Sequence, residues 1–127
     1  MKRLRTAKGR KVSSTRWLER QLNDPYVRRA KAEHYRSRAA YKLLELDERF
    51  GLLKGVKAVV DLGIAPGGWS QVVRRKAPQA SVVGIDLLPT DPIDGVAVLH
   101  MDFMDETAPA RLTEALGGPA DLVLSDM

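Results

Sequence analysis

The sequence has 127 residues, of which 44% are hydrophobic and 29% charged, a size and balance typical of one globular domain with a modest core. It contains no cysteine, which excludes disulfide bridges and thiolate metal sites, and no apolar run near the roughly 20 residues that span a bilayer. We therefore expect a monomeric, cytoplasmic protein with no membrane segment, no secretory signal and no bound metal.

The charge is distributed unevenly along the chain. Residues 1–42 contain 14 Lys or Arg against three acidic residues, a net charge of +11, whereas residues 43–127 contain 7 against 13, a net charge of −6. A basic segment joined to an acidic body favours a nucleic-acid partner, because Lys and Arg contacts release counterions from phosphates. A basic tail that only aids solubility is the alternative.

The N-terminal third of the chain is predicted to be an arm followed by helices. Residues 1–13 are rich in Lys and Arg and have little that can pack, so we expect them to be disordered. Ser14 is a candidate cap for a first helix. Asp24, followed by a proline, predicts the cap of a second helix over residues 26–33.

A third helix is expected from Ser37, as its cap, to about Phe50, where a glycine follows. Lys42 lies inside this helix, and a lysine in such a place is most often an ordinary solvated side chain. Arg36 and Arg38 precede the helix and form either a phosphate-binding patch or a solvated helix start. The two histidines of the chain are isolated and are interpreted as structural.

From residue 54 onward, strands and helices alternate. We expect strands at 58–62, 81–85, 96–100 and 121–125, with helices at 67–76 and 108–116. This alternation predicts an α/β, Rossmann-like fold with a doubly wound parallel sheet that binds its ligand at the carboxyl ends of the strands. A sheet that stops at its fourth strand leaves apolar surface uncovered. Residues 14–127 are therefore predicted to be the N-terminal portion of a larger domain, with a helical part at 14–53 and an α/β part at 54–127.

The first strand leads into a glycine-rich segment, DLGIAPGGWS, at residues 61–70. Its glycines allow the backbone to approach a ligand closely. The segment lacks the Gly-Lys-Ser/Thr ending of a phosphate-binding loop and the Gly-x-Gly-x-x-Gly spacing of a dinucleotide site. The acidic Asp61 would repel a pyrophosphate but favour the cationic methionine part of S-adenosylmethionine. A dinucleotide site, or a tight turn without a ligand, remains the alternative, and Trp69 is by default a core residue.

Acidic residues follow or end all four predicted strands: Asp61, Asp86, Asp102 and Asp126. A carboxylate at Asp86 is suited to accept hydrogen bonds from a ribose diol, and one at Asp102 from an adenine amino group. A single aspartate in a turn means little. Four at matching positions favour a ligand-binding edge.

These segments together resemble the RrmJ/FtsJ family of RNA ribose 2′-O-methyltransferases. The matching stretches are SRAAYKL at 37–43, DLGIAPGGWSQ at 61–71, DLLP at 86–89 and SDM at 125–127, and the likeness extends over 13–127. Members of this family are cytoplasmic enzymes that methylate a ribose 2′-hydroxyl in ribosomal RNA. The resemblance implies S-adenosylmethionine as cofactor and ribosomal RNA, within the large ribosomal subunit, as partner, with a uridine as acceptor.

The resemblance also implies the site residues. Asp86 matches the cofactor's ribose contact, Asp102 its adenine contact, and Asp126 borders the cofactor. Lys42 and Asp126 match the first two members of a Lys-Asp-Lys-Glu catalytic set, whose remaining lysine and glutamate would follow residue 127. We therefore expect this chain alone to transfer no methyl group. The cofactor loop is predicted to consist of Gly63, Pro66, Gly67, Gly68 and Trp69.

Methyl transfer to a ribose hydroxyl is an in-line displacement with a neutral leaving group, so the alignment of donor and acceptor supplies much of the rate. The hydroxyl is a weak nucleophile and benefits from a base or a nearby cation. Two other functions remain open. One is a non-catalytic fragment that binds S-adenosylmethionine or RNA. The other is a nucleotide-dependent oxidoreductase, which the spacing of Pro66, Gly67 and Gly68 disfavours.

Overall fold

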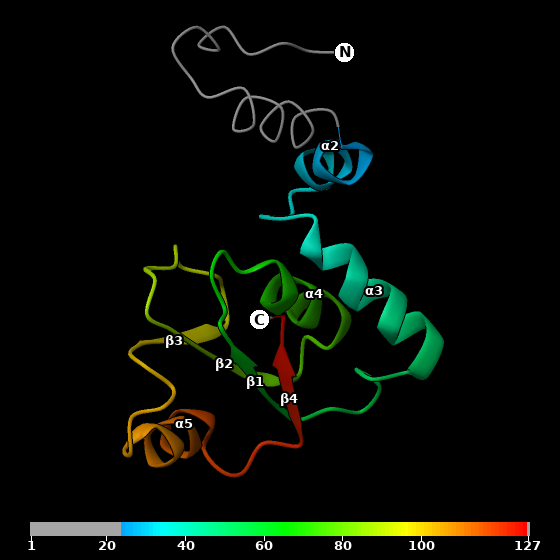
Figure 1. Ribbon diagram of the computed structural model, residues 1–127. Coiled ribbons are helices and arrows are strands. Elements are labelled where there is room, and N and C mark those ends of the chain that lie inside the picture. Colours follow the sequence, from blue (N-terminus) through cyan, green and yellow to red (C-terminus); the bar gives the residue numbers. More distant parts are fainter. Residues whose placement is uncertain (1–23, 127) are drawn as a thin grey trace, which may run out of the picture.

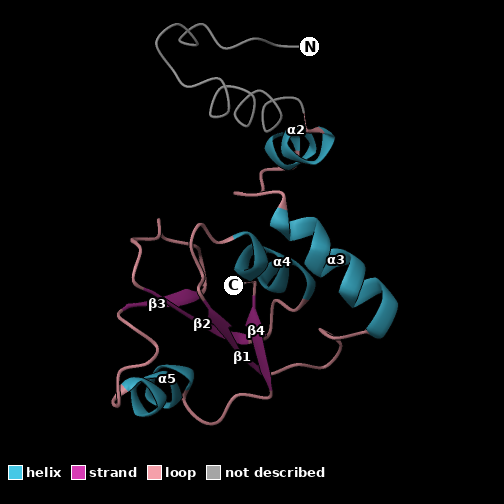
Figure 2. Ribbon diagram, viewed as in Figure 1, coloured by secondary structure: helices cyan, strands magenta, loops and turns pink. Residues whose placement is uncertain are grey.

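The computed structural model describes residues 24–126. The predicted arm and the predicted first helix after Ser14 lie outside the described residues. The strands form one parallel sheet, and no helix within 24–126 is long and apolar enough to cross a membrane. In chain order the elements are α2 (Pro25–Ala32), α3 (Ala39–Phe50), β1 (Ala58–Leu62), α4 (Gly68–Lys76), β2 (Ser81–Asp86), β3 (Val96–His100), α5 (Ala108–Leu116) and β4 (Leu122–Ser125) (Figures 1 and 2).

The strand order is β3-β2-β1-β4, with every neighbouring pair parallel. The chain moves outward from β1 to β2 and β3, and then returns through α5 to the other side of β1. The sheet is therefore doubly wound, as predicted. All strands stay parallel, but the side on which the chain adds the next strand changes between β1 and β4. In such sheets the carboxyl ends of the strands at the reversal point bind the ligand.

Two helical layers cover the sheet. α4 contacts β2, and α3 packs on α4, whereas α5 contacts β2 and β1. Figure 1 shows α3 and α4 on one side of the strands and α5 on the other. The main core lies under α3 and α4, where inward side chains of the strands meet both helices. Its members include Leu43, Val59, Trp69, Val72, Val73 and Val82.

Local sequence signals explain most element boundaries. Asp24 caps α2 as predicted, because one carboxylate oxygen accepts the amide protons of Tyr26 at 2.7 Å and Val27 at 3.4 Å. β4 begins one residue later than expected, at Leu122. The Asp121 carboxylate accepts the amides of residues 57 and 58 at 2.9 and 2.8 Å, which ties it to the start of β1.

The predicted cap of α3 is wrong. Arg38 occupies the N-cap position with helical dihedrals, and no side chain caps this end. Ser37 uses its backbone carbonyl to accept the amide of Ala40 at 3.4 Å. A side-chain cap needs an extended N-cap residue, and the chain is already turning here, so the Ser37 hydroxyl remains at the glycine-rich loop.

The link between α2 and α3 contains a left-handed residue that is not glycine. His34 has φ of +64°, and the amides of His34 and Tyr35 bond back to the carbonyls of Lys31 at 3.3 Å and Ala30 at 2.7 Å. This pattern is a Schellman motif, in which glycine is usual at the left-handed position. The His34 carbonyl also accepts bonds from α4, namely Gln71 Nε2 at 3.0 Å and an Arg75 nitrogen at 3.2 Å.

Replacing His34 by glycine should therefore stabilise the protein. A left-handed conformation costs a non-glycine residue roughly 1–2 kcal/mol, and the greater freedom of glycine in the unfolded chain returns roughly 0.5–1 kcal/mol. We expect His34→Gly to raise the free energy of unfolding by about 0.5–1 kcal/mol in urea titrations. His34→Ala, which keeps the strain, is the control, and an equal gain in both variants would contradict this explanation.

Candidate cofactor and catalytic site

The glycine-rich loop closes over the ends of β1 and β2. The amides of Gly63 and Ile64 both bond to the carbonyl of Ile85, at 2.9 and 3.3 Å. Gly84 in β2 lies beneath Ile64, and a Cβ at Gly84 would collide with that side chain. Gly84 therefore allows the loop to fold down onto the sheet, a role that the sequence did not indicate.

Asp86 is tied to this loop through its carboxylate. Its Oδ2 accepts the amide of Ala65 at 2.9 Å, and its Oδ1 accepts the amide of Leu88 at 2.8 Å. Each carboxylate oxygen can accept more than one hydrogen bond, so the group retains capacity for a ligand hydroxyl. Asp86 thus fixes the separation of the loop and the end of β2.

Asp61 is the buried carboxylate of the site, with 2% of its surface exposed. Its Oδ2 accepts a hydrogen bond of 2.7 Å from Ser70 Oγ, which is fully buried in α4. Burial raises the pKa of Asp61 from 3.8 to about 6, and the nearby charges of Asp126 and Asp86 act in the same direction, against the opposing effect of the Ser70 bond. A cation entering the pocket would relieve this crowding of negative charge.

Most of the predicted cofactor loop lines one pocket. Gly63, Pro66, Gly68, Trp69 and Asp126 all contribute to its wall, and the buried Asp61 and the displaced Ser37 join them. Neither Gly67, Asp86 nor Asp102 lies on that wall. Asp86 adjoins it through the bond to Ala65, which does line the pocket.

Gly67 and Trp69 have packing roles in addition. Gly67 has φ of +121°, and a Cβ there would lie 2.6 Å from Ile93 Cδ1. Trp69 is 7% exposed, and its indole Nε1 donates to the carbonyl of Ala39 at 2.7 Å. A Cβ at Gly68 would come within 2.7 Å of Ser37 Oγ. At both glycines, the space that a Cβ would fill is occupied by another side chain of the protein, Ile93 at Gly67 and Ser37 at Gly68.

A second pocket, of about 460 Å³, contains the predicted catalytic pair. Lys42 Nζ on α3 lies 3.7 Å from Oδ1 of Asp126, the residue that follows β4. Asp126 and Ala39 line both pockets. A group bound in the loop pocket and a group bound beside Lys42 would therefore meet at Asp126.

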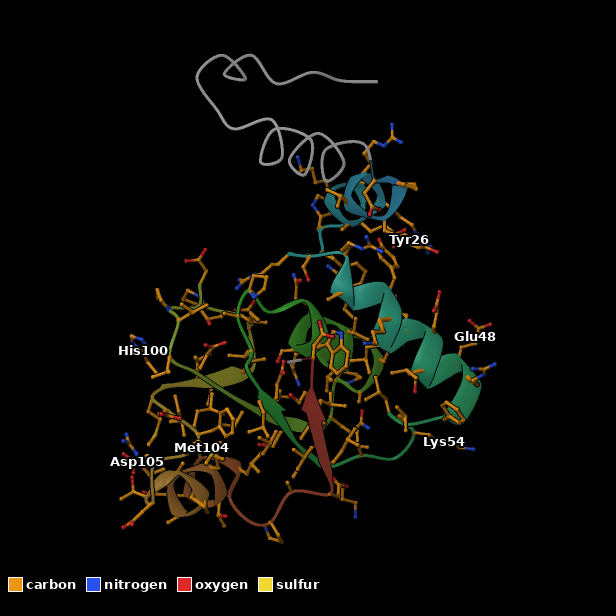
Figure 3. The ribbon with its side chains drawn as sticks, viewed as in Figure 1. Tyr26, Glu48, Lys54, His100, Met104 and Asp105 are labelled. Atoms are coloured by element: carbon orange, nitrogen blue, oxygen red, sulfur yellow. The ribbon has the colours of Figure 1, made fainter. Side chains whose placement is uncertain are left out.

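Two tyrosines and one arginine, Arg38, also line this second pocket. Tyr26 is 40% exposed and lies 5.8 Å, between ring centroids, from the buried Tyr41. Figure 3 shows Tyr26 extending from α2 toward the beginning of α3. Arg38 pairs with Asp24 and lies over the Tyr26 ring. Its charge is therefore partly neutralised, which does not match a free phosphate-binding patch.

Asp102 occupies a turn beyond β3, where it accepts the amide of Met104 at 2.9 Å. The amide of Met101 bonds to the carbonyl of Asp86 at 3.0 Å, so the ends of β2 and β3 are joined. Four large apolar side chains next to Asp86 and Asp102 in the sequence are exposed, and they are Leu87, Leu88, Phe103 and Met104. Figure 3 shows Met104 and Asp105 close to α5.

No three metal-binding side chains cluster anywhere in residues 24–126. The two pockets are lined by carboxylates, Lys42, Arg38, two tyrosines, backbone groups and apolar side chains. Within the loop pocket itself, the lining residues include two carboxylates and no cation. The pocket is small, with a volume of about 30 Å³, and its two carboxylates would repel anionic groups.

Comparison with known proteins gives a consistent result. The chain matches the FtsJ-like methyltransferase family over residues 35–127. It is 74% identical over 125 residues to the ribosomal RNA large subunit methyltransferase E of Rhizorhabdus wittichii, and 67% identical over 125 residues to that of Zymomonas mobilis. Each alignment covers 98% of this chain and 55% or 57% of the relative, so the chain spans about half the length of these proteins.

A solved structure agrees with the fold. A protein of Plasmodium falciparum, described as a ribosomal RNA methyltransferase, superimposes with a TM-score of 0.65 and 35% sequence identity. The superposition covers 73% of this chain and 56% of the other. The chain belongs to the FtsJ-like methyltransferase family, and its parallel sheet is the Rossmann-like sheet predicted from the sequence.

The packing at Gly67 predicts that a methyl group there is costly. We expect Gly67→Ala to lower the free energy of unfolding by about 2–4 kcal/mol, because it adds backbone strain and a collision with Ile93. Gly117→Ala is the matched control, since Gly117 has φ of +79° with no atom near its Cβ direction. The control should lose only about 1 kcal/mol, and equal losses in urea titrations would contradict the packing role.

The raised pKa of Asp61 predicts a dependence of stability on pH. The folded protein holds this proton more tightly than the unfolded chain does, so the contribution of Asp61 to stability is greatest at low pH. It should fall by on the order of 3 kcal/mol as the pH rises from about 4 through about 6. Asp61→Asn removes the titration. The difference between wild type and variant in urea titrations should change across this window, and a constant difference would contradict the assignment.

Proposed function

We propose that this chain is the cofactor-binding part of an S-adenosylmethionine-dependent RNA ribose 2′-O-methyltransferase. The observation that supports this most is the position of Asp126, which borders the glycine-loop pocket and pairs with Lys42 in the adjoining one. A methyltransferase needs two adjoining pockets of this kind, because the methyl donor and the acceptor oxygen must lie side by side and in line.

The charges around the loop pocket favour S-adenosylmethionine over a dinucleotide. Asp61 and Asp126 line the pocket without any lysine or arginine, and a pyrophosphate there would face two carboxylates. A sulfonium cation would instead be attracted to them. Asp86 retains acceptor capacity for the ribose hydroxyls, and the exposed Leu87 and Met104 offer apolar surface to a purine ring.

When bound, S-adenosylmethionine supplies a methyl group on a sulfonium that leaves as a neutral thioether. Lys42, which pairs with Asp126, would place a positive charge beside the ribose oxygen as that oxygen bonds to the methyl group and its proton passes to solvent. Asp126 orients that ammonium group. Trp69 and the α3 helix close the wall between the pockets.

We infer that the acceptor is ribosomal RNA of the large subunit and that the protein acts in the cytoplasm. The relatives named as ribosomal RNA large subunit methyltransferase E support this inference, as does the basic charge of residues 1–42. A binding role without catalysis is the second candidate, because the chain spans only about half the length of these relatives. Labelled methyl transfer to ribosomal RNA distinguishes the two roles.

The cofactor assignment predicts a specific loss at Asp86. Isothermal titration should show S-adenosylmethionine binding to the wild-type chain and none to Asp86→Ala. The exposed Asp94 on the same segment offers a matched control, and Asp94→Ala should bind normally. Unchanged affinity in Asp86→Ala would remove this residue from the site.

Asp86 also holds the loop, so a direct ribose contact needs a separate measurement. The wild-type chain should bind S-adenosylhomocysteine more tightly than its 2′-deoxy analogue, by about tenfold for one charge-assisted hydrogen bond. Asp86→Asn should reduce that preference. An equal preference in wild type and variant would leave Asp86 as a loop anchor only.

A further inference from the structure

Arg36 lies half-buried in the link between α2 and α3 and donates three hydrogen bonds to backbone carbonyls. Its Nη1 reaches the carbonyl of Pro66 at 3.2 Å and that of Asp91 at 2.5 Å, and its Nη2 reaches Pro92 at 2.5 Å. Its backbone amide donates to Gln71 Oε1 on α4 at 2.7 Å. One side chain therefore connects segments that are far apart in the sequence.

One segment bound by Arg36 lines the loop pocket, and the other follows the proposed ribose contact Asp86 in the chain. Pro66 lies in the glycine-rich loop and lines its pocket. Asp91 and Pro92 belong to the segment that follows Asp86 at the end of β2. Arg36 also packs beside Gly67, since a Cβ at Gly67 would lie at contact distance, 3.4 Å, from Arg36 Cδ and Nη1.

The chemistry of the group fits this bridging role better than phosphate binding. A guanidinium presents five N–H donors in a rigid plane, so it can satisfy several carbonyls at once, which a lysine ammonium does less well. In this structure the donors are directed at carbonyl oxygens of the protein. The phosphate-binding patch considered from the sequence therefore does not describe Arg36.

We propose that Arg36 is a positioning residue for the methyl donor. It sets the spacing between the glycine-rich loop and the Asp86 segment, and it couples both to the helical segment that contains Lys42. This inference rests on the proposed function. A ligand that contacts the loop with one end and Asp86 with the other then binds to a preorganised site, and loss of that order costs affinity.

Arg74 provides a matched control. It also donates three bonds to carbonyls, to Asp94 at 3.3 Å, Pro78 at 2.9 Å and Ala80 at 3.0 Å. It therefore reaches the same segment after β2, but none of these three carbonyls lies in the glycine-rich loop. Arg36→Met and Arg74→Met remove equal numbers of hydrogen bonds and differ in whether the loop is released.

The test is the affinity of the chain for S-adenosylhomocysteine by isothermal titration, at a temperature where circular dichroism finds each variant folded. We expect Arg36→Met to weaken binding by about tenfold or more and Arg74→Met by less than about twofold. Arg36→Lys, which keeps the charge and a long side chain, guards against a variant that does not fold, and it should also bind more weakly than wild type.

Each outcome decides between the two proposals. If the wild-type chain binds and Arg36→Lys or Arg36→Met binds equally well, the positioning role is wrong and the proposed function stands. Equal losses in the Arg36 and Arg74 variants would mean that both arginines act only through general stability, which also overturns it. If the wild-type chain itself does not bind the ligand, the proposed function fails, and the inference fails with it.

Discussion

The close approach of α3 to the beginning of α4 is the packing contact on which the site depends. Small residues make it possible, because a Cβ at Gly68 would press on Ser37. The indole of Trp69 then fixes the contact by donating to the carbonyl of Ala39. Lys42 lies one turn further along α3, so this contact decides whether its ammonium group can reach the end of β4 at 3.7 Å.

The electrostatics of the site follow from the same arrangement. The parallel strands bring their carboxyl ends, and the aspartates near them, to one edge of the sheet, and α4 covers Asp61 so completely that its pKa rises to about 6. Such concentrated negative charge is costly in a folded protein without a ligand. Proteins accept local costs of this kind at functional sites, where a bound cation offsets them.

Local patterns in the sequence were sufficient for the elements themselves. Strands β1 and β3 and helix α5 have the predicted bounds, because short runs of apolar and β-branched residues between glycine and proline turns leave little choice of structure. The Asp24 cap was predicted for the same reason, since the carboxylate acts on amides two and three residues away. The predicted Ser37 cap does not form, because the dihedrals of Arg38 depend on how the link between α2 and α3 docks against Gln71 and Arg75.

The sequence by itself determined the α/β class, the parallel sheet and the family, because all three depend on residue types at fixed short spacings. It also located Asp86 and Asp126 at one edge, since the carboxyl ends of parallel strands coincide. Only the tertiary structure decided that Arg36 binds carbonyls of the protein and that the Cβ directions of Gly67 and Gly68 face other protein segments. These contacts join residues some 30 to 55 positions apart, and the angle at which distant elements pack has no signature in local periodicity.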